Sequence, residues 1–310
     1  MPSDPVLMKL VPDDRRFQYV MADDDAGSLH MVDSWVKLSD LARQARFNAD
    51  TDTQYHLFTR QNPSQSQVLI RNNAASITNS NFNRNRRTAI LIHGWLGSAT
   101  AGSNTVLVPA YLAAEDVNVI VIDWSAGSTI GIRGQEVGRA VGAFVNWLNG
   151  LTGATPSQYH VIGFSVGGHT AGVVGRTVTG NVGYITGLDP SERWITNQEF
   201  RPNDAAYTEV IHTSVNDNGW FAPLAHVDFY PNGGIDMPGC ITTVCDHERS
   251  YHYMGESLRT GGFTGNRCNS HLDLNNCTGA RLAMGGRLPK TGSQGVYFLR
   301  TNIRTPFSQG

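Results

Sequence analysis

The sequence predicts an α/β fold, with a mostly parallel central sheet and helices on both faces. Apolar runs rich in Val and Ile recur along the chain, bounded by Gly, Asp or Pro, as is typical of central strands buried on both sides. Helix-like stretches lie between them, notably 134–148, where apolar residues repeat at helical spacing. Strands that alternate with helices indicate crossover units and hence a parallel sheet. The predicted central strands are 88–92, 117–122, 159–162 and 184–188.

The first 46 residues are more charged than the rest of the chain. Over 32–46 the apolar residues approximate a helical stripe, which predicts an amphipathic helix there. We interpret 1–46 as an N-terminal extension packed on the core rather than as a membrane anchor. The regular pattern begins near residue 47 with a predicted strand at 55–59, so we expect the α/β domain to span 47–310.

Composition narrows the class of protein. The chain has 310 residues, of which 40% are apolar and 16% charged, and its formal net charge is -2, which is typical of a globular protein. Such a balance gives no electrostatic reason to expect nucleic acid as a partner. No stretch approaches the ~20 apolar residues of a transmembrane helix. Residues 1–15 lack the pattern of a signal peptide, so we expect that a leader was never present or has been removed.

Ser165 is the candidate nucleophile, because it stands in a Gly-x-Ser-x-Gly pattern between Gly163 and Gly167. The pattern alone is weak evidence, but here the predicted strand 159–162 runs directly into it and a small-residue helix leaves it. This is the nucleophile elbow of the α/β-hydrolase fold, whose sharp turn lifts the serine above the sheet. A phosphate-binding turn is the alternative, but it would have more glycines and usually a Lys.

An elbow serine needs an acid and a histidine base, in the chain order Ser, Asp or Glu, His. Asp189 follows the predicted strand 184–188, where this fold places the acid, although an Asp before Pro is also a common turn cap. The base stays open, since four later histidines are candidates. His247 has the best position, because a nearby disulfide could fix its loop. The four are His226, His247, His252 and His271.

The four cysteines form two close pairs in the last quarter of the chain. A Cys-x4-Cys spacing can bind metal, but the second pair is spaced wider and lacks a matching pair of histidines. Two local disulfides in a secreted protein fit better. We therefore predict the bridges Cys240–Cys245 and Cys268–Cys277, and no metal site.

Seven short motifs together resemble the animal pancreatic-lipase family, with a likeness to insect neutral lipases. They occur in the family order over roughly residues 50–305, and their joint occurrence is far more specific than any one of them. The motifs are 93–95 (HGW), 121–124 (VIDW), 163–169 (GFSVGGH), 187–190 (GLDP), 210–213 (VIHT), 228–234 (DFYPNGG) and 245–250 (CDHERS).

The resemblance implies an α/β-hydrolase catalytic domain in which Ser165 is the nucleophile, Asp189 the orienting acid and His247 the general base. It also implies an oxyanion hole made by the backbone N–H groups of Trp95 and Val166, and hydrolysis through an acyl-enzyme without a cofactor. The expected protein is a secreted lipid acyl-ester hydrolase, of triacylglycerol lipase or phospholipase A1 type, that acts on lipids or at a lipid–water interface. The alternative is a non-catalytic yolk, storage or lipid-carrier relative, although such proteins lose the serine.

Departures from the family pattern lie around the site. The loop that carries the lid in the family is here only Cys240–Cys245, with four residues between the cysteines, and the loop 214–225 also looks short. A loop of four residues cannot cover an acyl groove, so we expect a site open to solvent, as in the phospholipase A1 members.

Two further departures concern partners of the family. The calcium site falls near 201–204, where Asp204 is retained but Arg201 stands at a position usually held by Asp, so we expect no bound ion. The chain ends soon after a predicted strand at 296–300, so we expect neither the C-terminal β-sandwich that binds lipid nor its docking of colipase.

Overall fold

The computed structural model describes residues 19–23, 29–33, 46–130, 133–192, 197–215, 217–274 and 276–310. Most of the predicted extension 1–46 therefore lies outside the described residues, apart from Arg46 and an antiparallel hairpin of β1 (Tyr19–Asp23) and β2 (Leu29–Asp33). Most of the helix expected over 32–46 also lies outside the described residues. Val32 and Asp33 belong to β2, so a helix does not begin at Val32.

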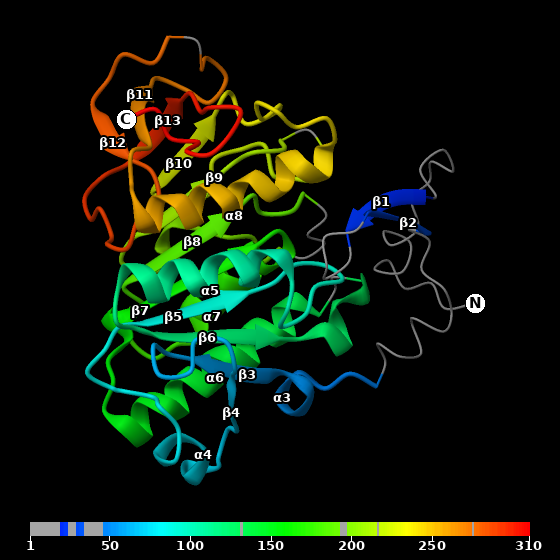
Figure 1. Ribbon diagram of the computed structural model, residues 1–310. Helices are drawn as coiled ribbons and strands as arrows, with labels where there is room; N and C mark the ends of the chain where they lie inside the picture. The colour runs from blue at the N-terminus through cyan, green and yellow to red at the C-terminus, as the bar shows by residue number, and fades with distance from the viewer. Residues whose placement is uncertain are drawn as a thin grey trace.

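The described residues form an eleven-stranded sheet in the order β12-β11-β13-β10-β9-β8-β7-β5-β6-β3-β4 (Figure 1). The seven strands from β13 to β6 are parallel, while two antiparallel strands extend each edge. The mostly parallel sheet is therefore confirmed. The strands are β3 (Gln54–Phe58), β4 (Gln67–Leu69), β5 (Thr88–Ile92), β6 (Asn118–Asp123), β7 (Tyr159–Phe164), β8 (Tyr184–Leu188), β9 (Thr208–Ile211), β10 (Val227–Pro231), β11 (Thr264–Cys268), β12 (Arg281–Ala283) and β13 (Gly295–Leu299).

Helices cover both faces of this sheet, which makes it the α/β-hydrolase fold that the sequence predicted. α5 (Gly102–Ala114) and α8 (Thr243–Arg259) lie on the face turned to the viewer in Figure 1, and α6 (Gly134–Thr152) and α7 (Val166–Thr177) on the other. Short helical segments complete the described part of the chain: α3 (Ala49–Asp52), α4 (Ala74–Thr78), η2 (Ser125–Ile130), η3 (Pro156–Gln158) and η4 (Pro202–Asp204).

The central strands are mostly apolar because each buries both of its faces. In β5, Ile90 and Ile92 join the core beneath α6 and α7, whereas Ala89 and Leu91 join the core beneath α5 and α8. All four are at most 2% exposed. Such strands cannot alternate polar with apolar residues, which explains why continuous apolar runs identified them.

Register aligns the carboxyl ends of the central strands. Gly163 of β7 pairs with Ile92 of β5 on one side and with Gly187 of β8 on the other. The residues that follow β5, β7 and β8 therefore leave the sheet together at one edge, where open α/β sheets place their ligands. Ser165 and Asp189 are among these residues.

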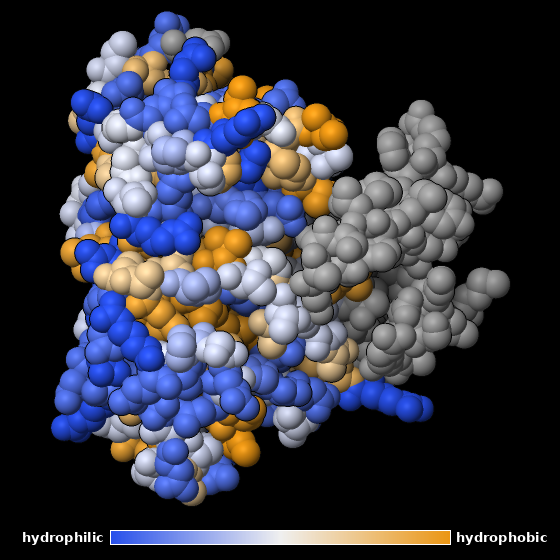
Figure 2. Space-filling view, viewed as in Figure 1, coloured by the Kyte–Doolittle hydropathy of each residue, from blue (hydrophilic) through white to orange (hydrophobic). Residues whose placement is uncertain are grey.

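Both predicted disulfides are present. Cys240 is bonded to Cys245, which joins the segment before α8 to the first turn of that helix, and Cys268, the last residue of β11, is bonded to Cys277. Within the described part of the chain, no helix combines the length and hydropathy that crossing a membrane requires. The face seen in Figure 2 mixes hydrophilic residues with separate apolar patches.

Candidate active site

The turn at Ser165 has the predicted strand–elbow–helix geometry. Ser165 follows β7, caps α7 and has φ 57°, in the left-handed region that non-glycine residues seldom adopt. A Cβ at Gly163 would lie 1.9 Å from the carbonyl oxygen of Gly167, and one at Gly167 would lie 2.3 Å from that of Ile92. Glycine is therefore required on both sides of the serine. Val166, whose N–H was predicted as an oxyanion donor, is the first residue of α7, where N–H groups have no intrahelical partner.

The predicted acid and base are in direct contact. His247 Nδ1 lies 2.6 Å from Asp189 Oδ2, and the Asp189 side chain is fully buried. Burial alone would raise the pKa of Asp189, but hydrogen bonds from His247, Ser214 and Thr213 outweigh it and hold the pKa below its usual value. The lowered pKa favours an ionised Asp189 carboxylate in contact with the imidazole.

His247 lies in a helix, not in the loop that we expected. α8 begins at Thr243 because the Thr242 side chain accepts a hydrogen bond from the Cys245 N–H, so the disulfide spans the helix start. The His247 ring lies 4.5 Å from that of Phe164, the residue before Ser165, which places it beside the elbow. Of the other candidate bases, His226 contacts Thr208 instead.

The loop after β5 brings the other predicted oxyanion donor, Trp95, to the same edge. Gly94 lies directly against the elbow, because a Cβ there would be 2.9 Å from Ser165 Cβ and 3.2 Å from the carbonyl oxygen of Phe164. Only a residue without a side chain allows the backbone of this loop to approach the serine so closely. Trp95 is the next residue along the chain.

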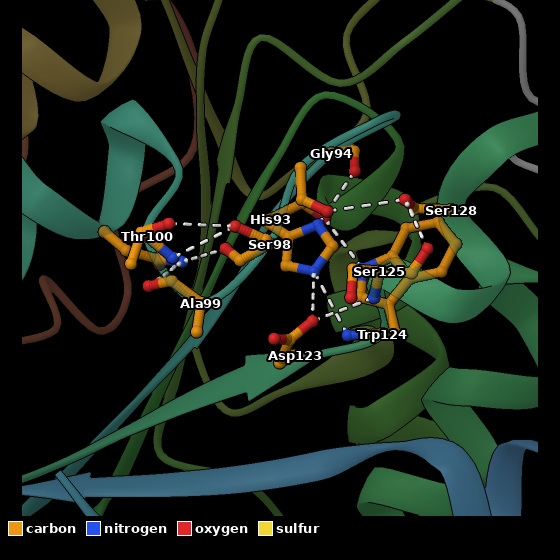
Figure 3. A network of polar contacts seen from close by, with 11 residues as sticks. His93, Gly94, Ser98, Ala99, Thr100, Asp123, Trp124, Ser125 and Ser128 are labelled. Carbon is orange, nitrogen blue, oxygen red and sulfur yellow. Dashed lines mark hydrogen bonds and ion pairs between the residues drawn. The ribbon is translucent and has the colours of Figure 1, made fainter. Parts of the chain in front are cut away.

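His93 holds this loop in place, a role that the sequence did not reveal (Figure 3). Its fully buried ring accepts a hydrogen bond at Nε2 from the Trp124 N–H, at 3.1 Å, and its Nδ1 faces the carbonyl oxygen of Gly94 at 2.9 Å. A carbonyl only accepts, so the ring proton lies on Nδ1. The indole N–H of Trp124 donates back to the His93 carbonyl at 3.1 Å.

The segment that the resemblance assigns to calcium does not fit that ion. Arg176 Nη1 lies 2.5 Å from Asp204 Oδ1, and the same guanidinium donates to the carbonyl oxygens of Gln198, at 2.9 Å, and Glu199, at 3.2 Å. Calcium needs six to eight oxygen ligands, and these oxygens already accept hydrogen bonds from a cation. Arg201 adds a second positive charge, which lies 3.8 Å from the Glu199 carboxylate and opposes the rise that burial causes in the pKa of Asp204.

Sequence reasoning missed Ser214 and a second buried His–Asp pair. Ser214 Oγ donates to Asp189 Oδ2 at 2.5 Å and lies 3.3 Å from His247 Nδ1. The pair is His212 and Asp228, whose side chains meet at 2.9 Å. A signal existed, since both members of the pair belong to motifs that carried the family resemblance and Ser214 directly follows one of them.

Comparison with known protein families identifies the family of the chain. The family model described as Lipase matches residues 30–307. The chain belongs to the lipase family. The resemblance predicted from the seven motifs is therefore confirmed.

Alignments with individual relatives cover most of this chain but only about half of each relative. Pancreatic lipase-related protein 2 of Cavia porcellus is 38% identical over 237 residues, which are 71% of this chain and 55% of that protein. Pancreatic triacylglycerol lipase of Homo sapiens is 34% identical over 257 residues, covering 72% and 55%. The chain thus spans about half the length of the curated relatives it matches.

Solved structures show a weaker likeness. Thermogutta terrifontis esterase 2 phosphonylated by sarin aligns with 55% of this chain and 71% of that chain, at 11% identity and a TM-score of 0.37. The assignment of the fold rests on the strand order and helix layers, not on this overlap.

Proposed function

We propose that the protein is a carboxylic ester hydrolase that cleaves lipid acyl esters, with Ser165 as nucleophile, His247 as general base and Asp189 as orienting acid. One observation carries the proposal: the 2.6 Å contact between His247 and a buried, ionised Asp189, at the sheet edge where the strained elbow presents Ser165. Ser165 is held at φ 57° between two obligatory glycines, and proteins keep such backbone strain mainly at functional sites.

The proposed reaction has two halves. Ser165 Oγ attacks the ester carbonyl while His247 takes its proton, and His247 then protonates the departing alcohol. Water attacks the acyl-enzyme in the same way and releases the fatty acid. In both halves the negative charge on the substrate oxygen is stabilised by the N–H groups of Trp95 and Val166. Asp189 keeps the His247 ring in the required tautomer and stabilises the imidazolium that forms.

The contact between His93 and Gly94 supports the role of Trp95. In a trans peptide, the carbonyl of one residue and the N–H of the next point in opposite directions. His93 fixes the carbonyl of Gly94 toward the buried ring, and the Trp95 N–H of the same peptide is thereby aimed away from it. The preorganised donor that an oxyanion hole requires would be set in this way.

The proposed substrate is a glyceride or a phospholipid cleaved at its first position, met at a lipid–water interface. The names of the relatives point to triacylglycerol, whereas the short lid favours phospholipase A1 activity. Only four residues separate Cys240 from Cys245, and Ile241 among them is 98% exposed. We place catalysis in a domain spanning 47–310, in a secreted protein.

A short-chain ester such as p-nitrophenyl butyrate tests the catalytic proposal. We expect the wild type to hydrolyse it and Ser165→Ala to lose about 10⁶-fold in kcat, as nucleophile removal does in other serine hydrolases. Equal rates, or a serine that an organophosphate does not label, would favour the non-catalytic alternative. A panel of triolein, phosphatidylcholine and a galactolipid then separates the substrates, and dominant turnover of triolein would contradict the short-lid argument.

A further inference from the structure

Behind the proposed acid lies a second His–Asp pair that the reaction itself does not use. His212 follows β9, Asp228 lies on β10, and both residues are at most 1% exposed. His212 Nε2 lies 2.9 Å from Asp228 Oδ1, and the ring stacks on Tyr230 with centroids 4.2 Å apart. Taking two ionisable groups out of water is costly, so the pair needs a reason to be there.

The partners of the pair show what it holds. His212 Nδ1 faces the carbonyl oxygen of Trp220 at 2.9 Å, so both ring nitrogens face oxygen acceptors, which an imidazolium satisfies at once. Asp228 also accepts hydrogen bonds from the backbone N–H groups of Leu224, at 2.9 Å, and Ala225, at 3.0 Å. The pair therefore anchors both the middle and the end of the acid-side loop, which we define as residues 213–225 without the undescribed residue 216.

The same loop encloses Asp189. Its first two residues donate backbone hydrogen bonds to Asp189 Oδ1, from Thr213 at 2.7 Å and from Ser214 at 3.2 Å. Gly219 lies so close that a Cβ there would be 2.4 Å from Asp189 Oδ1. The Trp220 N–H donates to the carbonyl oxygen of Pro190 at 2.7 Å. The loop that supplies these donors is thus held by His212 at Trp220 and by Asp228 at Leu224 and Ala225.

We propose that His212 and Asp228 are positioning residues for Asp189, acting through the acid-side loop to keep its carboxylate aimed at His247. This inference rests on the proposed function, because it gives the pair a part in that same site. If loss of the pair displaced the acid-side loop by ~1 Å, catalysis would slow measurably, since misplacement by this amount can cost about 10²-fold in rate.

The test combines His212→Gln with Asp189→Asn. With p-nitrophenyl butyrate we expect His212→Gln to lower kcat by roughly 10- to 100-fold while KM changes less than about threefold. In the Asp189→Asn background the same change should have almost no further effect, because the group it positions is gone. Additive losses in the double variant, or an unchanged kcat in the single one, would overturn the proposal.

His160→Gln is the matched control. His160 is another buried histidine with both ring nitrogens engaged, at 2.7 Å from Tyr111 Oη and 2.8 Å from Thr186 Oγ1, but it lies on β7 away from the carboxyl edge of the sheet. It should lose thermal stability and keep kcat. If His212→Gln does not fold, Asp228→Asn, which keeps the volume of the side chain, replaces it under the same expectations.

Amide hydrogen exchange gives a readout that does not need turnover. We expect peptides covering 214–222 to exchange faster in His212→Gln, or in Asp228→Asn, than in His160→Gln, at equal temperature and pH. Unchanged exchange there would overturn the positioning role. An inactive wild type whose acid-side loop still loosens would count against the proposed function alone, so the two failures are distinguishable.

Discussion

Ser165 lies between two loops that are held by different chemistry. On one side, β5 leads into the His93 loop, residues 93–97, which a neutral ring and backbone groups fix. On the other side, β8 leads to Asp189 and β9 leads to the acid-side loop. This loop is held by hydrogen bonds to the Asp189 carboxylate and by the pair of His212 and Asp228. The carboxylate nearest the His93 ring, Asp123, lies 3.7 Å from Nε2 and is partly exposed, whereas the acid-side loop surrounds the fully buried carboxylate of Asp189.

The difference follows from what each side has to do in the proposed reaction. The His93 loop presents an N–H dipole to a charge that exists only in the transition state, and a neutral anchor does not compete for that charge. The acid side holds a permanent carboxylate out of water, which requires several donors at all times. We therefore expect substitutions and pH changes to have unequal effects on the two loops.

Among the changes that compare the two loops, the largest effect is expected for Asp189→Asn. The amide keeps the shape but neither stabilises an imidazolium nor selects the His247 tautomer, and the equivalent change in a serine protease lowers kcat about 10⁴-fold. Steady-state kinetics with p-nitrophenyl butyrate measure the loss. Thermal unfolding should show a folded variant, and a loss of less than tenfold would mean that another acid serves His247.

The His93 loop is tested by two substitutions at one position. His93→Gln retains a polar group near Nε2 but removes the donor that faces the carbonyl of Gly94, so the Trp95 N–H is no longer aimed. We expect a loss in kcat of roughly 10²-fold, as when an oxyanion donor is removed. His93→Asn keeps a donor near Nδ1 and should lose clearly less. Equal losses in the two variants would exclude orientation through Gly94.

The elements of this contrast differ in how far the sequence predicts them. β5 and β8 were predicted at their observed bounds, because strands buried on both faces form mostly apolar runs. Ser165 and Asp189 follow from strand ends and an elbow that only glycine allows. His247 cannot be predicted in this way, because it lies on a helix 58 residues from Asp189 in the chain. Only the family resemblance selected it.

What the sequence could not supply is long-range contact. α5 was not predicted because it buries polar Ser103 and Asn104 as well as apolar residues and contains Pro109, so no helical stripe identifies it. The pairing of His212 with Asp228, and of both with the loop around Asp189, exists only when β8, β9 and β10 lie side by side. Motif matching named both residues without giving them a role.

Acidification should loosen the acid side before the His93 loop. His169 bridges the Ser191 carbonyl and the Phe200 N–H, and burial, with the charge of Arg176, lowers its pKa from 6.5 to about 4. The folded state thus binds this proton less readily than the unfolded state, so stability falls as the pH drops from 6.5 toward 4, by about 3 kcal/mol for this group.

Urea unfolding of the wild type and of His169→Asn at pH 7 and pH 4.5 measures this effect. The variant should be less stable at pH 7 but lose less stability on acidification, because the group that takes up the proton is gone. Hydrogen exchange should rise first near 190–200 and only later near 93–97. Equal pH slopes in the two proteins would remove His169 as the cause.

The smallest expected effect is on the response to calcium. The oxygens around Asp204 already accept hydrogen bonds from Arg176, so the melting temperature and kcat of the wild type should be the same in EDTA and in millimolar calcium chloride. Arg176→Met shows that the assay can detect a change there, because a buried carboxylate left without its cation costs roughly 3 kcal/mol. A wild type that melts lower in EDTA would show that a divalent ion contributes beside the guanidinium. The region around Asp204 would then be stabilised by a bound ion, whereas the His93 loop is held by hydrogen bonds within the chain.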